Sequence, residues 1–285
     1  MKKVLLQLLI CFNLISYSQT KYNLDKIVCP NDTLCYLKFD MTLLNGVVNN
    51  VYSNGNLEYE SSYKNGKLNG LHREWFESDQ LKSEGNFKDN KQEGYWFSYY
   101  DNGQLYLDRA YKDGLIEGIW RDYYESGQLK SEANHRNGYY EGLNRSWYEN
   151  GQLQWERNYD GGRHTSLTGV DREWFENGQL KSESNNHWGW SIGLHRYWYE
   201  NGQLESEGNY IPEEDGLHTK WYENGQLEWE CNFKEGKEEG LYRSWYENGQ
   251  LKKEGTYIDG KKDRLHREWF ENGQLKTENI YDNGN

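Results

Sequence analysis

The chain has 285 residues and a net charge of −13, and only 35% of its residues are hydrophobic although 16% are aromatic. The low hydrophobic content excludes an ordinary globular domain with a thick core, for which about 45–50% is typical, and the many rings exclude a disordered chain. An acidic surface repels phosphate backbones and anionic lipids, so neither nucleic acid nor membrane lipid is an expected partner.

The first residues have the features of a secretion signal. Two lysines precede a mostly apolar run over residues 4–15, and Ser16 and Ser18 are small residues at the positions that a signal peptidase reads. We therefore predict a signal peptide over 1–18 and export to the periplasm or the outer surface. Two alternatives remain open, a buried N-terminal helix in a cytoplasmic protein and lipidation at Cys11.

Residues 19–45 precede the regular part of the sequence and are expected to form an N-terminal cap on it. Cys29 and Cys35 are close enough in sequence to close a small disulfide in an oxidising compartment. Cys231 has no evident mate, and we interpret it as a small strand side chain rather than a reactive thiol.

Residues 46–285 consist of ten repeats. A Tyr/Phe-x-x-Gly-x-Leu core recurs, and most of its successive spacings are 24 residues, the period expected of a stacked repeat protein. One spacing is three residues longer, around 154–173, and one is a residue shorter, near Pro212, both where a connecting loop is expected. The glycine of the core, or the residue in its place, stands at Gly55, Asp79, Gly103, Gly127, Gly151, Gly178, Gly202, Gly225, Gly249 and Gly273.

Each repeat is expected to be a β-hairpin. Two strand-like runs flank an Asn-Gly pair in eight of the repeats, and Asn-Gly favours a two-residue type I′ turn because both central residues need positive φ. The predicted fold is all-β, an elongated, coiled, single-layer antiparallel sheet of about ten tandem hairpins.

A two-residue turn predicts which residues face each other across a hairpin. The Tyr or Phe before the turn is expected to oppose the following Leu, as in Tyr199–Leu204. An Arg six residues before the glycine then opposes a Glu five residues after it, and opposite charges across a pair stabilise it by about 0.2–1 kcal/mol. The seven predicted pairs are Arg73–Glu84, Arg121–Glu132, Arg145–Glu156, Arg172–Glu183, Arg196–Glu207, Arg243–Glu254 and Arg267–Glu278.

This register assigns residues to the two faces of the sheet. One face carries the Tyr/Phe, the Leu and a later ring, and is expected to be the more buried. The other carries a tryptophan series among the Arg–Glu pairs. Contiguous exposed rings mark binding surfaces, although packing against neighbouring strands and arginine stems is an alternative role. The candidate partner-binding residues are Trp147, Trp174, Trp198, Trp221, Trp245 and Trp269.

Four histidines share one repeat position, His72, His195, His218 and His266. Equivalent residues of successive hairpins stand about 10 Å apart, which is too far for a shared zinc ion with bonds of about 2.0–2.1 Å. We therefore expect solvated strand histidines, no metal site and no cofactor. The repeated carboxylates already face arginines and no catalytic motif is present, so an enzyme is not expected.

The repeat resembles the MORN repeat variant, the form seen in bacterial YwqK-type antitoxins. Residues 198–204 and 245–251, Trp-Tyr-Glu-Asn-Gly-Gln-Leu in both places, carry the likeness, which covers residues 46–285. The resemblance implies hairpin stacks that contact proteins, in some members a cognate toxin. We accordingly expect a non-enzymatic scaffold that binds another protein, a basic one given the acidic charge, as a toxin-neutralising or immunity-type partner. The alternative is a carbohydrate-binding module of the cell envelope, since cell-wall-binding repeats also use Gly and aromatic hairpins. The predicted export distinguishes this chain from a cytoplasmic antitoxin, which would not be exported.

Overall fold

The computed structural model describes residues 19–30, 33–161, 166–211 and 213–282. The predicted signal peptide at 1–18 and Pro212 lie outside these residues. Within the described part of the chain, no helix combines the length and apolar character needed to span a bilayer.

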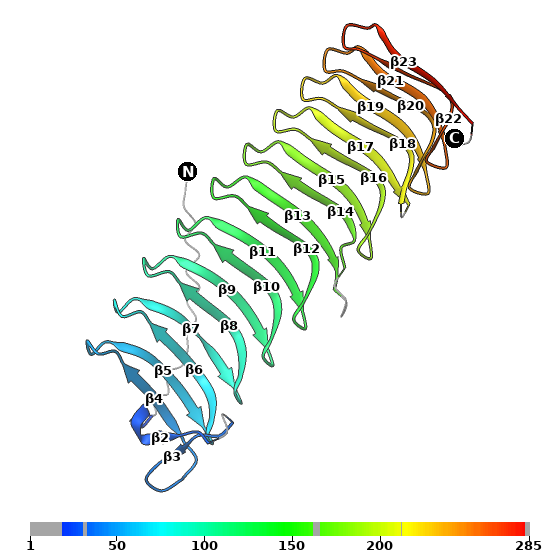
Figure 1. Cartoon of the computed structure of the whole chain (residues 1–285). Helices are drawn as coiled ribbons and strands as arrows, with labels where there is room; N and C mark the ends of the chain where they lie inside the picture. Colours follow the sequence, from blue (N-terminus) through cyan, green and yellow to red (C-terminus); the bar gives the residue numbers. More distant parts are fainter. Residues whose placement is uncertain (1–18, 31–32, 162–165, 212, 283–285) are drawn as a thin grey trace, which may run out of the picture.

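The described chain forms one long open sheet of 21 strands and a small two-stranded sheet, so the prediction of an all-β stack of hairpins is confirmed. From β4 onward, consecutive strands pair antiparallel in chain order, and β1 pairs in parallel with β4 at the N-terminal edge. Figure 1 shows the hairpins side by side along one axis, from blue to red, each with curved strands. Apart from the N-terminal cap, no described segment covers either face, so this is a single layer.

The strands have nearly constant length, as the repeat requires. The N-terminal elements are β1 (Lys21–Asn23), the 3-10 helix η1 (Leu24–Lys26), β2 (Ile27–Val28) and β3 (Tyr36–Leu37). The repeats contain β4 (Gly46–Val51), β5 (Leu57–Lys64), β6 (Lys67–Trp75), β7 (Leu81–Lys88), β8 (Lys91–Tyr99), β9 (Leu105–Lys112), β10 (Leu115–Tyr123), β11 (Leu129–Arg136), β12 (Tyr139–Trp147), β13 (Leu153–Asp160), β14 (Gly169–Trp174), β15 (Leu180–His187), β16 (Trp190–Trp198), β17 (Leu204–Ile211), β18 (Glu213–Trp221), β19 (Leu227–Lys234), β20 (Lys237–Trp245), β21 (Leu251–Ile258), β22 (Lys261–Trp269) and β23 (Leu275–Tyr281).

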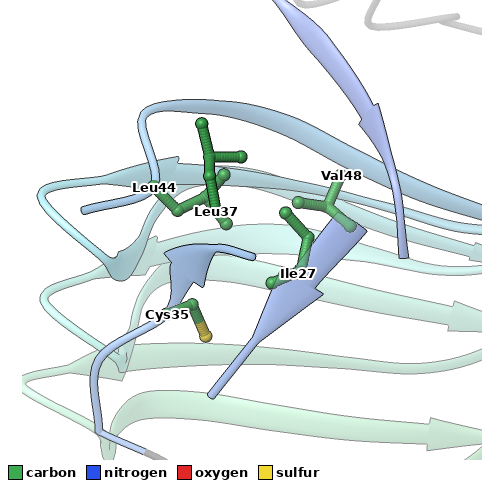
Figure 2. Packing of buried hydrophobic residues seen from close by; sticks show 5 residues of the cluster. All are labelled: Ile27, Cys35, Leu37, Leu44 and Val48. Atoms are coloured by element: carbon green, nitrogen blue, oxygen red, sulfur yellow. The ribbon is translucent and has the colours of Figure 1, made fainter. Parts of the chain in front are cut away.

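Residues 19–45 pack on the first repeats and enclose the one cluster of buried aliphatic side chains in the described chain. Its members, shown in Figure 2, are Ile27, Cys35, Leu37, Leu44 and Val48. The backbone N–H of Cys35 donates to the carbonyl of Gly66 at 2.7 Å, which ties the segment to the β5–β6 connection. Cys29 and Cys35 are joined by a disulfide.

The first strand of each hairpin bends near its start. The pairing register shifts there, as between Glu183 and Asn185 of β15 where it meets β16. A glycine with φ between 68° and 109° stands at the bend in eight repeats, a conformation that costs glycine little. The glycines are Gly70, Gly94, Gly118, Gly142, Gly169, Gly193, Gly216 and Gly240.

The prediction of a two-residue type I′ turn is wrong. In the β16–β17 hairpin, the N–H of Tyr199 donates to the carbonyl of Gln203 and the N–H of Gly202 donates to the carbonyl of Tyr199, both at 2.9 Å. The loop therefore has three residues and ends in Gly202 at φ +86°, whereas Asn201 has no positive φ. This is the three-residue hairpin with a glycine bulge. The other hairpins repeat the same two bonds.

The predicted register is right for the Arg–Glu pairs and wrong for the pairs of Tyr or Phe with Leu. All seven Arg–Glu pairs are opposed as expected, for example Arg196 and Glu207. Leu204, however, opposes Trp198 rather than Tyr199. A bulge opposite the step from Tyr197 to Trp198 leaves Glu205 unpaired, and this extra residue compensates for the longer loop. The leucines therefore share a face with the tryptophans and not with the Tyr/Phe residues.

The asparagine before the turn glycine connects successive repeats. Asn201 accepts a hydrogen bond from the N–H of Gln203 at 2.8 Å and donates from Nδ2 to the carbonyl of Glu223 in the next repeat at 3.0 Å. The hydroxyl of Tyr199 likewise donates to the carbonyl of Trp221 at 2.8 Å. Stacking of the turns thus satisfies backbone carbonyls that the turn itself leaves free.

The three-residue insertion weakens one junction of the sheet. β13 and β14 share only two register pairs, Trp155–Glu173 and Glu156–Arg172. The extra residues fall between Asp160, the end of β13, and Gly169, the start of β14, a stretch in which residues 162–165 lie outside the described part of the chain.

Candidate functional site

The more buried face of the sheet, here called the ring face, is built on the position that carries the repeated histidines. His195 and His218 are each only 4% exposed. The expectation of solvated histidines is therefore wrong, because the bent arms and the neighbouring repeats enclose this position. Its residues form the inner row, His72, Trp96, Trp120, Asn144, Asp171, His195, His218, Tyr242 and His266.

Rings from the second strand of nine hairpins stand between the residues of the inner row, and Asn186 takes their place in β15. The ring centroids of His195 and Tyr210 are 4.6 Å apart, those of Tyr210 and His218 are 5.3 Å apart, and those of His218 and Phe233 are 5.0 Å apart. Edge-to-face and tilted pairs at such distances add stability beyond the area that they bury. The ladder of rings along the sheet supplies the core that a second layer would normally provide.

Each inner-row side chain lies over a residue of the preceding repeat, and the two are matched in size or charge. Gly208 lies beneath His218, whose Nε2 donates to the carbonyl of Asn209 at 2.9 Å. Where the lower residue is an arginine, the partner is acidic or a large ring. Arg157 is paired with Asp171 at 3.2 Å, and Arg109 lies 3.7 Å from the ring centroid of Trp120.

Burial shifts the pKa values of three groups on the ring face in the direction that favours their neutral forms. Burial lowers the pKa of His135 and of His195 from the usual 6.5. Burial also raises the pKa of the Cys231 thiol to about 11, and its Sγ donates to the carbonyl of Asn232. No group of three or more His, Cys, Asp or Glu side chains in the described ranges is arranged to hold a metal ion.

The opposite face, here called the Arg–Glu face, carries a ladder of ion pairs. The Nε to Oε2 distances of the seven predicted pairs lie between 2.7 and 3.2 Å. Weaker contacts of 3.7 Å join successive repeats, as between Arg172 and Glu156. Acidic and basic side chains therefore alternate across most of the sheet.

Three repeats lack the arginine of the ladder: Asn49 stands in its place in the first repeat, and Phe97 and Thr219 interrupt the ladder farther along. Asp108, opposite Phe97, keeps a contact of 3.7 Å with Arg121 of the next repeat. Burial raises the pKa of this carboxyl from its ordinary value, and the Arg121 charge opposes that shift.

The six candidate tryptophans lie in one line on the Arg–Glu face, close to the hairpin turns. All six are half-buried, so each offers a partner only part of its indole. Each has the leucine after the turn as its cross-strand neighbour, as in Trp245–Leu251. The structure thus gathers all six residues into a single strip that alternates with leucine.

A second apolar row on the same face was missed by the sequence reasoning. It directly follows the bend and contains more exposed side chains than the tryptophan strip, with Leu217 at 53% and Tyr95 at 69%. The available signal was the recurrent pair of Gly and an apolar residue before the Arg position. This leucine row consists of Leu71, Tyr95, Ile119, Leu143, Val170, Leu194, Leu217, Leu241 and Leu265.

Two solved structures similar to this chain are remote likenesses. The TcdB2-TccC3 crystal structure has 11% identity and a TM-score of 0.20, with 84% of this chain and 15% of that chain covered. The Photorhabdus luminescens Tc holotoxin pore has 14% identity and a TM-score of 0.19, with 85% and 14% covered. This chain therefore spans about one seventh of those proteins, and scores this low inform neither fold nor function. No curated protein matches the chain.

The comparison with protein families is decisive, because the MORN repeat variant profile matches ten successive segments. They are residues 44–65, 68–89, 92–113, 116–137, 140–160, 167–185, 192–211, 214–235, 238–259 and 265–283. These segments coincide with the structural hairpins and cover most of the chain. The chain belongs to the MORN repeat variant family and is a repeat scaffold.

Proposed function

We propose that this scaffold is a non-enzymatic, exported protein that binds a protein partner with a basic surface along its Arg–Glu face. The observation that carries the proposal is the leucine row, in which Leu194, Leu217 and Leu241 of successive repeats are 38%, 53% and 41% exposed. Contiguous exposed apolar side chains are a mark of interaction surfaces. The tryptophan strip runs parallel to this row, with the ion-pair ladder between them.

The composition of this face suits a protein partner. Interfaces of this class have apolar centres with aromatic residues and arginine, bordered by polar groups. The charge of −13 favours a basic partner, because charge complementarity speeds association and excludes wrong partners. The resemblance to antitoxins suggests that the partner is a toxin, which the exported chain would bind and neutralise. A carbohydrate partner remains the alternative to be tested.

The test is affinity capture from the native envelope fraction with the full purified chain as bait. We expect one basic protein in stoichiometric amount. Its capture should be lost when Leu194, Leu217 and Leu241 are all changed to Ser, substitutions at exposed positions that leave the ring ladder intact.

The matched control changes Leu115, Tyr139 and Ile258 to Ser. These side chains are 50%, 40% and 41% exposed but lie outside the leucine row. Equal loss in both variants, or retention of the chain on envelope polysaccharide without a protein, would contradict the proposal. If the captured protein is a toxin, its co-production with this chain should restore growth of the host cell.

A further inference from the structure

In the ring face, lysines of the chain itself cover the aromatic residue that precedes the turn in four repeats. Lys130 Nζ lies 5.4 Å from the ring centroid of Tyr124, and Lys252 Nζ lies 5.3 Å from that of Tyr246. Lys181 and Lys276 lie over Phe175 and Phe270 in the same way. An ammonium group over a ring face is attracted by the electrons of the ring.

Carboxylates complete two of these four intramolecular sites. The ammonium of Lys181 is 3.6 Å from Glu173, and that of Lys276 is 3.6 Å from Glu268. Two repeats therefore share one arrangement, a lysine side chain held between a ring and an acid on the ring face near the turn.

The third repeat keeps the ring, Tyr100, but has Ser98 in the place of Glu173 and Glu268 and has no lysine there. Tyr106 occupies the lysine position, 44% exposed, with its ring centroid 5.0 Å from that of Tyr100. A hollow of about 560 Å³ opens at this point, lined by residues from β6 to the turn after β10. Its lining combines aromatic residues with hydroxyl and charged groups, and consists of Glu74, Phe76, Lys82, Ser83, Ser98, Tyr99, Tyr100, Asp101, Tyr106 and Glu125.

The charge of the hollow favours a cation. Three carboxylates stand against one ammonium, and Lys82 is already 3.5 Å from Glu74. Glu125 and Asp101 are exposed at the rim, so the hollow presents rings on its walls and negative charge at its mouth. These are the requirements for binding an organic ammonium group.

We propose that this hollow binds a lysine side chain of a protein segment, in the position that the chain's own lysines occupy in four other repeats. The site lies on the opposite face from the leucine row and is therefore independent of the proposed function. The chemistry is an ammonium between Tyr100, Tyr106 and the rim carboxylates, with the lysine methylenes against the rings.

The test uses the full chain and the peptide acetyl-Gly-Lys-Gly-amide, whose binding is followed by saturation-transfer NMR of the lysine methylene signals. The peptide in which Glu replaces Lys should not bind. Tyr106→Lys restores the residue found in the four covered repeats, so the fold is preserved while the site is filled from within. We expect this variant to bind the lysine peptide at least tenfold more weakly.

The matched control is Tyr139→Lys, which makes the same change of side chain and charge at a tyrosine that is 40% exposed outside the hollow. It should leave the affinity within twofold. Equal weakening by both variants would mean that only net charge matters, which overturns the site. Binding of a neutral oligosaccharide such as cellotetraose at Tyr106, with no binding of the lysine peptide, would also overturn it.

Discussion

Replacing Gly208 by alanine tests the packing of the ring ladder directly. A Cβ at this position would lie 2.1 Å from Nδ1 of His218, far inside van der Waals contact. The backbone of Gly208 does not have a positive φ, so the substitution introduces no backbone strain and its effect comes from this contact alone. His218 is 4% exposed and has rings on both sides, so it must shift within a packed environment.

The expected cost follows from what the shift disrupts. Overpacking a buried site costs about 1–3 kcal/mol. Losing the 2.9 Å bond from Nε2 to the carbonyl of Asn209 leaves a buried N–H without a partner, at about 1–3 kcal/mol. Against this, alanine is favoured over glycine in a strand by about 0.5–1 kcal/mol. We expect Gly208→Ala to lower the free energy of unfolding by about 1–3 kcal/mol.

The assay is urea unfolding followed by circular dichroism, together with amide hydrogen exchange to locate the damage. Because repeat proteins are stabilised mainly by nearest neighbours, faster exchange should be confined to β17, β18 and the adjoining strands. Unchanged or increased stability of Gly208→Ala would refute the packing described for the ring ladder.

A compensating variant sharpens the test. In an earlier repeat, Ala133 occupies the position of Gly208 and is followed in the inner row by Asn144, whose Oδ1 accepts a bond from the N–H of Asn134 at 2.8 Å. Combining Gly208→Ala with His218→Asn reproduces that pair. The double variant should recover at least about 1 kcal/mol relative to the sum of the single changes. Strict additivity would show that the two positions are not coupled.

Three further predictions concern the charges and the buried groups. Arg196→Glu should destabilise its hairpin by about 0.5–1 kcal/mol in urea unfolding, because its cross-strand neighbours are acidic on both sides, and Glu207→Arg should restore part of the loss; no coupling would contradict the ion-pair ladder. Because the pKa of His195 is lowered on folding, its contribution is fully present above its unfolded value of 6.5 and is lost as the pH falls through the folded pKa. The urea midpoint should therefore fall less between pH 7.5 and 5 in His195→Tyr than in the parent chain, and an equal fall would contradict burial of the neutral ring. The Cys231 thiol, with a pKa of about 11, should react with iodoacetamide at pH 8 only after urea unfolding, and rapid reaction of the folded chain would show that it is accessible.

Much of the fold could be predicted because the same hairpin pattern recurs in each repeat of the sequence. The period of 24 residues and the alternation of side chains determine tandem hairpins, and the Arg–Glu pairs determine which residues face each other. This register survives the error in the turn, because a three-residue loop followed by one bulge places Arg196 opposite Glu207 just as a two-residue loop would. The alignment of the six tryptophans was likewise accessible from their constant position.

The remaining features depend on contacts between repeats and were decided only by the tertiary structure. Asn201 could serve a type I′ turn, but its side chain bonds to the carbonyl of Glu223 in the next repeat, and this stacking accompanies the three-residue loop. The residue type of His218 does not predict whether it is buried. It is buried because the strands bend and rings of two hairpins enclose it. Leu217 is apolar by sequence yet 53% exposed, since a single-layer sheet has nothing to cover its outer face. Local sequence sets the hairpin, whereas burial is a property of the stack.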